Sequence, residues 1–199
     1  MITRTPGPER ARLGFVEEVL AAFDFLTSEY GFRIVEVEVT FVRYETAEVF
    51  VNIYHGRSSY ELGVEVGCFA GMIDSFERKF WIGDFIDWAG ARGETNFTFA
   101  MASSPEKVKY WMPRLAALVR KYAGKALSGD ALTFAQLLEV QTRVAHEYWK
   151  ERDLPGLKEE VHMAWHAKDY AKVVELYEPV RDDLSPAELK KLEYARKHL

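Results

Sequence analysis

A change in hydrophobic period along the chain constrains the fold more than any other feature of this sequence. Between residues 32 and 66, apolar and polar side chains alternate in three runs, which is the period of a half-buried β-strand. Short turns near Glu45 and Gly56 separate the runs, so they predict an antiparallel meander. Residues 9–30, and most residues after Ser103, repeat instead at three and four positions, the period of amphipathic helices. The predicted fold is therefore α+β: an N-terminal helix packed on an antiparallel β-meander, followed by a helical C-terminal half.

Shorter elements are predicted directly after the meander. Phe76–Trp81 has the composition of a fourth strand, and Phe97–Met101 that of one more short strand. Between them, Asp84 has the side chain of an N-cap and precedes a short apolar helix that ends at Gly90.

Helical spacing dominates the second half of the chain. Helices are predicted over 104–126, over 131–151 and in two or three pieces over 157–199. Ser128–Gly129 interrupts this pattern, because serine and glycine favour a turn over a continuous helix. The predicted domains are therefore an α+β domain over 1–129 and a helical extension packed on it over 130–199.

Composition and the single cysteine limit the setting in which the chain works. The 199 residues are 48% hydrophobic and 29% charged, which is typical of a globular protein. No apolar run approaches the roughly 20 residues that cross a bilayer, so no membrane partner is expected. Cys68 has no second cysteine to pair with, and Met1–Pro8 lack the pattern of a secretory signal. These features predict a cytoplasmic protein.

The residue types used in catalysis and cofactor binding do not form a recognised motif in this sequence. His55 and Ser58 lie in a turn between two predicted strands, whereas a nucleophile elbow joins a strand to a helix. His162 and His166 have a helical spacing that can hold zinc, but Met163 stands where a metalloprotease motif has glutamate. We therefore expect no catalytic residue, no cofactor and no resident metal.

Charge is distributed unevenly along the chain. Residues 30–102 carry six basic and eleven acidic side chains, whereas residues 103–129 carry six basic and one acidic. The basic helix can contact nucleic acid or an acidic partner, but the net charge of −5 argues against a general affinity for nucleic acid. The same helix can also lie across the acidic strands and neutralise them within the chain, or remain a solvated helix face.

The predicted sheet has one apolar face and one acidic face. If Val35, Val37 and their counterparts in the next two strands point inward, the alternate positions point outward. Carboxylates interleaved with aromatic rings suit a surface that meets a basic protein, because charge steers the encounter and rings anchor the contact. The predicted partner-binding residues are Glu36, Glu38, Glu48, Phe50, Tyr54, Glu61 and Glu65.

Several short stretches carry a family resemblance. They are Phe23–Leu26, Glu29–Phe32, Thr40–Glu45, Tyr60–Gly63, Leu115–Tyr122 and Ser128–Asp130. These stretches resemble a group of uncharacterised bacterial proteins with a helix, a meander and a helical tail. In size and charge, such α+β proteins are similar to the immunity proteins of bacterial toxin systems, which bind a basic toxin and block it.

A second resemblance concerns the C-terminal segment. Ala164–Pro179 combines small residues, an aromatic residue and a terminal proline, and it resembles one unit of a tetratricopeptide repeat. The chain contains no second copy, so the segment is expected to form a single helical hairpin.

Two interpretations of function follow. The first is a protein-binding module without catalysis, an immunity-type inhibitor that occludes a basic toxin through its acidic sheet face. The second is a small-molecule-binding or enzymatic domain with a pocket near His55, Arg57 and Trp81. A closed apolar cavity with convergent polar groups would favour the second interpretation.

Overall fold

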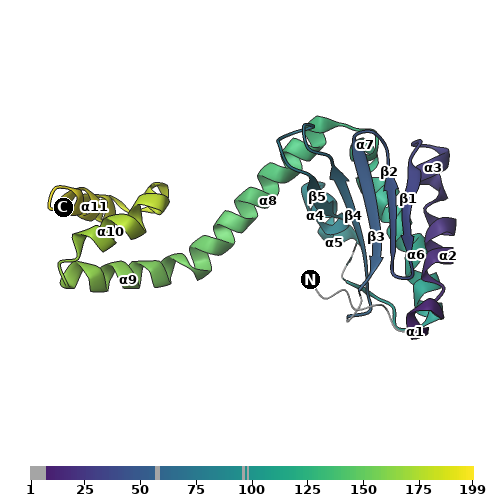
Figure 1. The fold of residues 1–199 in the computed structure, drawn as a ribbon, viewed down its shortest axis with the longest axis horizontal. Coiled ribbons are helices and arrows are strands. Elements are labelled where there is room, and N and C mark those ends of the chain that lie inside the picture. Colours follow the sequence, from purple (N-terminus) through teal and green to yellow (C-terminus); the bar gives the residue numbers. More distant parts are fainter. Residues whose placement is uncertain (1–7, 57–58, 96, 98) are drawn as a thin grey trace. The chain divides into compact units, whose positions relative to one another are not determined.

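The structure is a computed structural model in which residues 8–56, 59–95, 97 and 99–199 are described (Figure 1). Of these described residues, 58% are helical and 17% are in strands of an antiparallel sheet, so the predicted α+β class is confirmed. The chain divides into two compact units, Met1–Val140 and Gln141–Leu199. The first unit contains the sheet and the second is helical. Within the described ranges, no helix has both the length and the apolar character needed to cross a membrane.

The strands of the sheet pair antiparallel throughout. The described strands are β1 (Arg33–Glu38), β2 (Phe41–Glu45), β3 (Val49–His55), β4 (Glu61–Cys68), β5 (Arg78–Trp81) and β6 (Ala100–Met101). Their order is β1-β2-β3-β4-β5, and β6 pairs with the start of β4. The predicted strands in the second and third alternating runs are therefore confirmed, as is the strand that ends at Trp81.

The first alternating run contains two strands rather than one. Val39 and Thr40 form the turn between β1 and β2, across which Glu38 pairs with Phe41. Neither turn residue is the glycine, asparagine or proline that usually marks a hairpin. The alternation of apolar and polar residues therefore continues through the turn and hides it.

β1 is an edge strand with a bulge. Its register with β2 shifts between Ile34 and Glu36, which leaves Val35 as an extra residue. All six residues of β1 are exposed, and Val35 and Val37 keep 50% and 51% of their surface accessible. Val35 is the bulge residue, and Val37 pairs with the core residue Val42, but neither valine is buried as expected, because β1 lies at the margin of the sheet.

The predicted N-terminal helix over 9–30 is divided into short helices. The helices of the first unit are α1 (Pro8–Ala11), α2 (Phe15–Ala22), α3 (Asp24–Ser28), α4 (Ile82–Trp88), α5 (Arg92–Thr95), α6 (Pro105–Tyr122) and α7 (Gly124–Leu127). Gly14, in the left-handed region with φ of 68°, precedes α2, and Phe23 with φ of −102° separates α2 from α3. The apolar stripe stays on one side through both breaks, which explains why its spacing reads as one helix.

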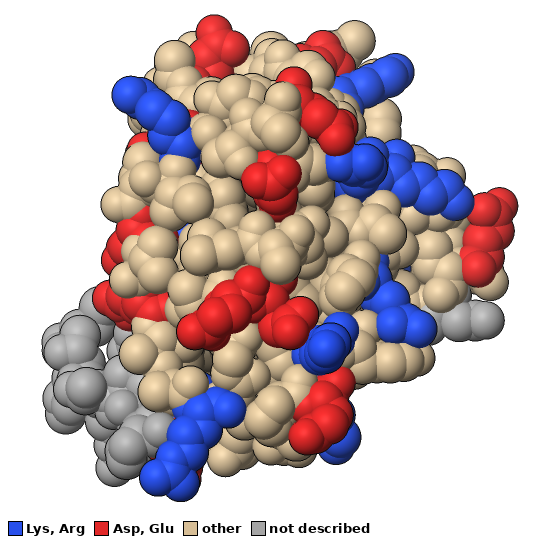
Figure 2. Space-filling model, turned by 90° about the vertical axis from the view of Figure 1, so that its right-hand side faces the viewer, with Lys and Arg blue, Asp and Glu red and all other residues tan. Residues whose placement is uncertain are grey.

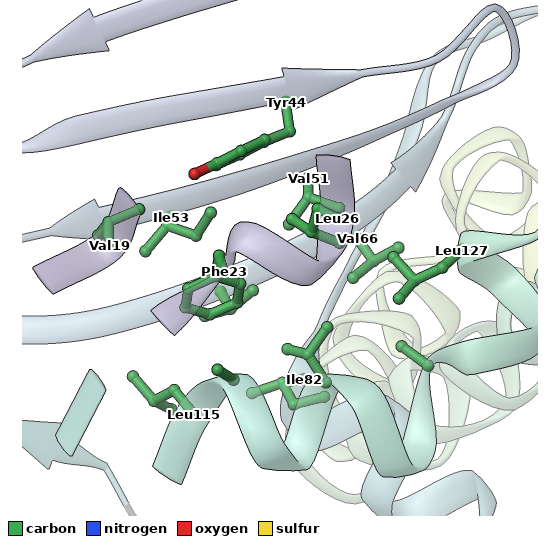
Figure 3. Packing of buried hydrophobic residues seen from close by; sticks show 14 of the residues in the cluster. Val19, Phe23, Leu26, Tyr44, Val51, Ile53, Val66, Ile82, Leu115 and Leu127 are labelled. Atoms are coloured by element: carbon green, nitrogen blue, oxygen red, sulfur yellow. The ribbon is translucent and has the colours of Figure 1, made fainter. Parts of the chain in front are cut away.

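The helices pack against one face of the sheet and enclose the main core with it. Side chains of α2, α3, α4, α6 and α7 meet those of β2, β3 and β4 there (Figure 3). Members labelled in Figure 3 are Val19, Phe23, Leu26, Tyr44, Val51, Ile53, Val66, Ile82, Leu115 and Leu127. We call this the inner face of the sheet and the opposite face the outer face.

The helix α8 (Ala131–Arg152) starts in the first unit. Its residues Phe134 and Leu137 belong to the main core, with 0% and 1% of their surface exposed. The first unit consequently ends after Val140, inside α8, and not at the Ser128–Gly129 break that the sequence suggests as a domain boundary.

The second unit has a core of its own. Its helices after α8 are α9 (Leu154–His166), α10 (Tyr170–Tyr177), η1 (Glu178–Asp183) and α11 (Pro186–Arg196). α10 packs against both α9 and α11. The buried side chains between them are Val161, Ala164, Val173, Tyr177, Leu184, Leu192 and Ala195.

Candidate protein-binding surface

The strand register arranges the side chains of the outer face in rows that run across the strands. The first row is Arg33, Glu45, Phe50, Gly67 and Lys79. The middle row is Glu36, Arg43, Asn52, Glu65 and Trp81. The third row is Glu38, Phe41, Tyr54 and Gly63. Carboxylates and aromatic rings share this face, as alternation predicts, but the cations Arg33, Arg43 and Lys79 lie among them.

Aromatic rings of β3 lie flat over glycines of β4. A Cβ atom added to Gly63 would lie 2.1 Å from the Tyr54 ring, and one added to Gly67 would lie 2.2 Å from the Phe50 ring. The guanidinium carbon of Arg43 lies 4.1 Å from the centroid of the Phe50 ring. The centroids of the Phe50 and Phe69 rings are 5.4 Å apart. Phe50 is consequently fully buried, so the expectation that it is an exposed anchor for a partner is wrong.

Arg43, Asn52 and Glu65 of the middle row form a polar ladder, and residues of the first row pair with the charges at its two ends. Arg43 Nη1 donates a hydrogen bond to Asn52 Oδ1 at 3.3 Å, and Asn52 Nδ2 donates to Glu65 Oε2 at 3.2 Å. Lys79 Nζ lies 2.9 Å from Glu65 Oε1, and Arg43 Nε lies 2.6 Å from Glu45 Oε1. Glu65, a predicted partner contact, is thus already paired with a cation of this chain.

A hollow of about 380 Å³ opens beside this ladder, where β1 turns into β2 and β3 ends. Its lining is Glu36, Glu38, Thr40, Phe41, Tyr54, His55 and Gly56. Three predicted partner-binding residues, Glu36, Glu38 and Tyr54, therefore lie together. Thr40 and Phe41 are not among the predicted residues, because their place in the hollow depends on the unmarked turn at Val39–Thr40. The opposite charges of Glu36 and Arg43 could have indicated this turn, because residues of opposite charge favour direct pairing across two neighbouring strands.

Two carboxylates, those of Glu36 and Glu38, belong to the lining of the hollow. Burial, reinforced by the charges of Glu65 and Glu61, raises the pKa of Tyr54 to about 12. Its phenol is therefore protonated at neutral pH and can donate a hydrogen bond. Among the residues that the structure describes, Glu36 and Glu61 form no ion pair. This end of the outer face therefore keeps negative charge that the rest of the face neutralises.

A buried polar cluster supports the hollow from the inner side. Arg10 and His55 are 4% and 1% exposed, and Arg10 Nη1 lies 3.4 Å from His55 Nδ1. His55 Nε2 lies 2.8 Å from the carbonyl oxygen of Ala102, and the Arg10 guanidinium lies 3.7 Å from the centre of the Tyr60 ring. Burial lowers the pKa of His55, so the imidazole is neutral, with Nε2–H donating to Ala102. Both ring nitrogens are engaged, and His55 serves as a structural side chain.

Other predicted site residues lie away from the hollow. Glu48 precedes β3 at its opposite end, where its carboxylate is next to Gly129. Trp81 packs on Phe97 and Phe99, with ring centroids 5.5 and 5.4 Å apart. Trp81 is not among the residues that line the hollow, and Arg57 and Ser58 lie outside the described residues.

The basic helix belongs to the inner helical layer. α6 packs against α2 and the inner side of β4, and it buries Val108, Met112 and Leu115 in the main core. One of its cations, Arg120, pairs with Glu29 at 2.5 Å. On the side of the molecule seen in Figure 2, acidic and basic side chains are interspersed. The helix of the basic segment 103–129 therefore packs in the inner layer and does not lie across the outer face of the sheet.

Comparisons with protein-family models, with curated proteins and with solved structures give no match to this chain. Within the described residues, no group of three or more His, Cys, Asp or Glu side chains is placed to hold a metal ion. The site is therefore interpreted from its own geometry and charge.

Proposed function

We propose that the protein is a binding protein without catalytic activity and that the hollow receives a basic segment of a partner protein. The observation that carries this proposal is the joint position of Glu36, Glu38 and Tyr54 in one hollow, with Glu61 beside it. Carboxylates attract lysine and arginine side chains over the distance of a Debye length, about 8–10 Å at ordinary salt. The phenol of Tyr54 and the ring of Phe41 offer flat surfaces against which a guanidinium can stack.

A binding role accounts for the site better than catalysis does. A general base needs an accessible ring nitrogen or carboxylate with a pKa near the working pH. The one histidine at the hollow, His55, is buried, and its Nε2 is committed to a backbone carbonyl. The lowered pKa of His55 keeps the ring neutral but does not make it accessible.

The cellular role that fits these properties is immunity-type inhibition. An acidic protein that docks on a basic toxin would block the toxin by covering its surface, and long-range attraction would speed the encounter. Two features support this role: the net charge of −5, and an acidic hollow that the basic α6 leaves uncovered.

Charge reversal at the hollow tests the proposal. We expect the double variant Glu36→Lys/Glu61→Lys to bind a fluorescein-labelled oligoarginine peptide about tenfold more weakly than the unmodified protein. Its binding should also respond less to salt between about 50 and 300 mM, because the attraction is electrostatic. Fluorescence anisotropy measures both effects.

The matched control is Glu17→Lys/Glu94→Lys, which makes the same change in net charge on exposed helical positions. If the control weakens binding as much as the hollow variant does, the effect is one of net charge and the hollow is not the site. In a second arm, a basic toxin captured from the source cells on the unmodified protein, but not on the hollow variant, would support the immunity-type role.

A further inference from the structure

Two histidines on α9 bring their ring nitrogens to one point. His162 and His166 are four residues apart, so they lie on the same face of the helix, and both are exposed. Their Nε2 atoms are 3.1 Å apart. The ring centroids are 4.4 Å apart, with an angle of 65° between the ring planes. Two good metal ligands therefore converge on the surface of the second unit, far along the chain from the hollow.

The distance between the two nitrogens matches the bite of a chelating pair. Imidazole nitrogens bind zinc at about 2.0–2.1 Å, so donors 3.1 Å apart subtend an angle of about 95–102° at the metal. This range falls between the roughly 90° of neighbouring square-planar ligands and the roughly 109° of a tetrahedron. The pair can therefore hold a divalent metal in either geometry without moving the helix.

We propose that His162 and His166 form a bidentate site for a divalent transition metal of the copper, nickel and zinc group. Both imidazoles bind through the lone pairs of Nε2, which suits these borderline metals better than the oxygen-seeking Mg²⁺ or Ca²⁺. Within the described residues, no third His, Cys, Asp or Glu completes the set. Water, or a ligand from another molecule, fills the remaining positions, so the metal stays exchangeable.

The same nitrogen distance also permits a direct hydrogen bond between the two rings, in which one Nε2–H donates to the other. In that arrangement the donating ring must move its proton to Nδ1 before Nε2 can bind a metal. The two arrangements differ in what they predict: a hydrogen-bonded pair needs no metal, whereas a chelating pair binds one equivalent.

Titration of the full-length protein with Zn²⁺, followed by calorimetry, tests the site. We expect one Zn²⁺ per chain, binding that weakens when the pH falls to about 5, and no heat with Mg²⁺. His162→Gln and His166→Gln should each weaken Zn²⁺ binding at least about tenfold, because each removes half of the ligand set. Both substitutions lie on an exposed helix face, so the variants should remain folded, which circular dichroism would check.

His146→Gln is the matched control, since His146 is an exposed histidine of the same unit that pairs with Asp183 at 2.8 Å. It should leave Zn²⁺ binding unchanged. With Cu²⁺, electron paramagnetic resonance should show two equivalent imidazole nitrogens. The proposal fails if the unmodified protein binds no tighter than His162→Gln/His166→Gln, or if the resonance spectrum shows a different number of nitrogens.

Discussion

Two glycines of β4 determine how the outer face is built. Gly63 and Gly67 lack the Cβ atoms that would hold the aromatic rings of β3 away from the sheet. The rings of Tyr54 and Phe50 therefore lie on the backbone of β4, and Arg43 covers Phe50 in turn. The outer face thus contains one fully buried aromatic side chain, which lies between a glycine of β4 and the guanidinium of Arg43.

The first prediction concerns Gly67→Ala. The new methyl group would lie 2.2 Å from the Phe50 ring and 2.4 Å from the carbonyl oxygen of Arg78, a backbone atom. We expect a loss of about 2–3 kcal/mol in the free energy of unfolding, measured with urea, since neither neighbour can move cheaply. Gly63→Ala should cost less, because its close neighbour is the half-buried ring of Tyr54.

Gly93→Ala provides the baseline for this comparison. No atom lies within 4 Å of a Cβ added there, and the residue is in α5. This variant should be as stable as the unmodified protein or slightly more so. A Gly67→Ala variant of equal stability would show that Phe50 does not rest on β4.

A second prediction concerns the pH dependence that His55 confers. Burial lowers its pKa below the ordinary value of 6.5, so the unfolded chain binds a proton more readily than the folded protein does. Stability is therefore unaffected by this group above pH 6.5 and falls as the pH drops below it. Urea unfolding from pH 8 to about 5 should show the decline, and His55→Gln should reduce the slope.

Carboxyl groups with lowered pKa values affect the free energy of unfolding in a more acidic pH range than His55 does. Hydrogen bonds from Thr133 and from His146 lower the pKa of Asp130 and Asp183 from 3.8, so their effects appear only at lower pH. Direct titration of the His55 ring by nuclear magnetic resonance is the independent check. An imidazole that becomes charged above pH 6.5 would contradict the neutral, buried ring.

At the scale of elements, the sequence predicts what is local and periodic. The predictions of β3, β4 and α6 are correct, because alternation or helical spacing extends over several residues in each of these elements. The turn at Val39–Thr40 and the breaks at Gly14 and Phe23 are missed, since none of them disturbs the apolar spacing around it. The bulge at Val35 is also missed, because a bulge depends on the partner strand.

The candidate site is predictable only in part for the same reason. The residue types of the outer face follow from alternation, and three of the seven predicted partner-binding residues line the hollow. Which carboxylates are neutralised depends on register: Glu65 meets Lys79 across β4 and β5, whereas Glu36 lies on the edge strand. Such pairings join residues from different strands, and no local pattern specifies them.

At the scale of the whole molecule, two separate cores predict two separate responses to mutation. Leu137 is buried in the main core and Leu192 in the core of the second unit, each with 1% exposure. Leu→Ala at such positions costs about 2–5 kcal/mol. We expect Leu137→Ala to increase amide hydrogen exchange in β3 and β4 at least about 30-fold, and to leave α10 and α11 unchanged.

Leu192→Ala is the reciprocal variant and should accelerate exchange in α10 and α11 only. Mass spectrometry of exchanged peptides reads both units in one experiment. Equal acceleration in both units by either variant would mean that the chain unfolds as a single cooperative body, contrary to its division at Val140.

The course of α8 bears on how such a chain can be recombined. Phe134 and Leu137 lie beyond the turn at Gly129, yet the sheet needs them to complete its core. A chimera joined at the Ser128–Gly129 turn would therefore take Phe134 and Leu137 from a different protein than the rest of the main core. An N-terminal module for such a chimera has to include the first turns of α8, up to Val140. A new C-terminal module has to be joined within α8, so that the helix continues without a break and its side chains keep their angular positions around the helix axis.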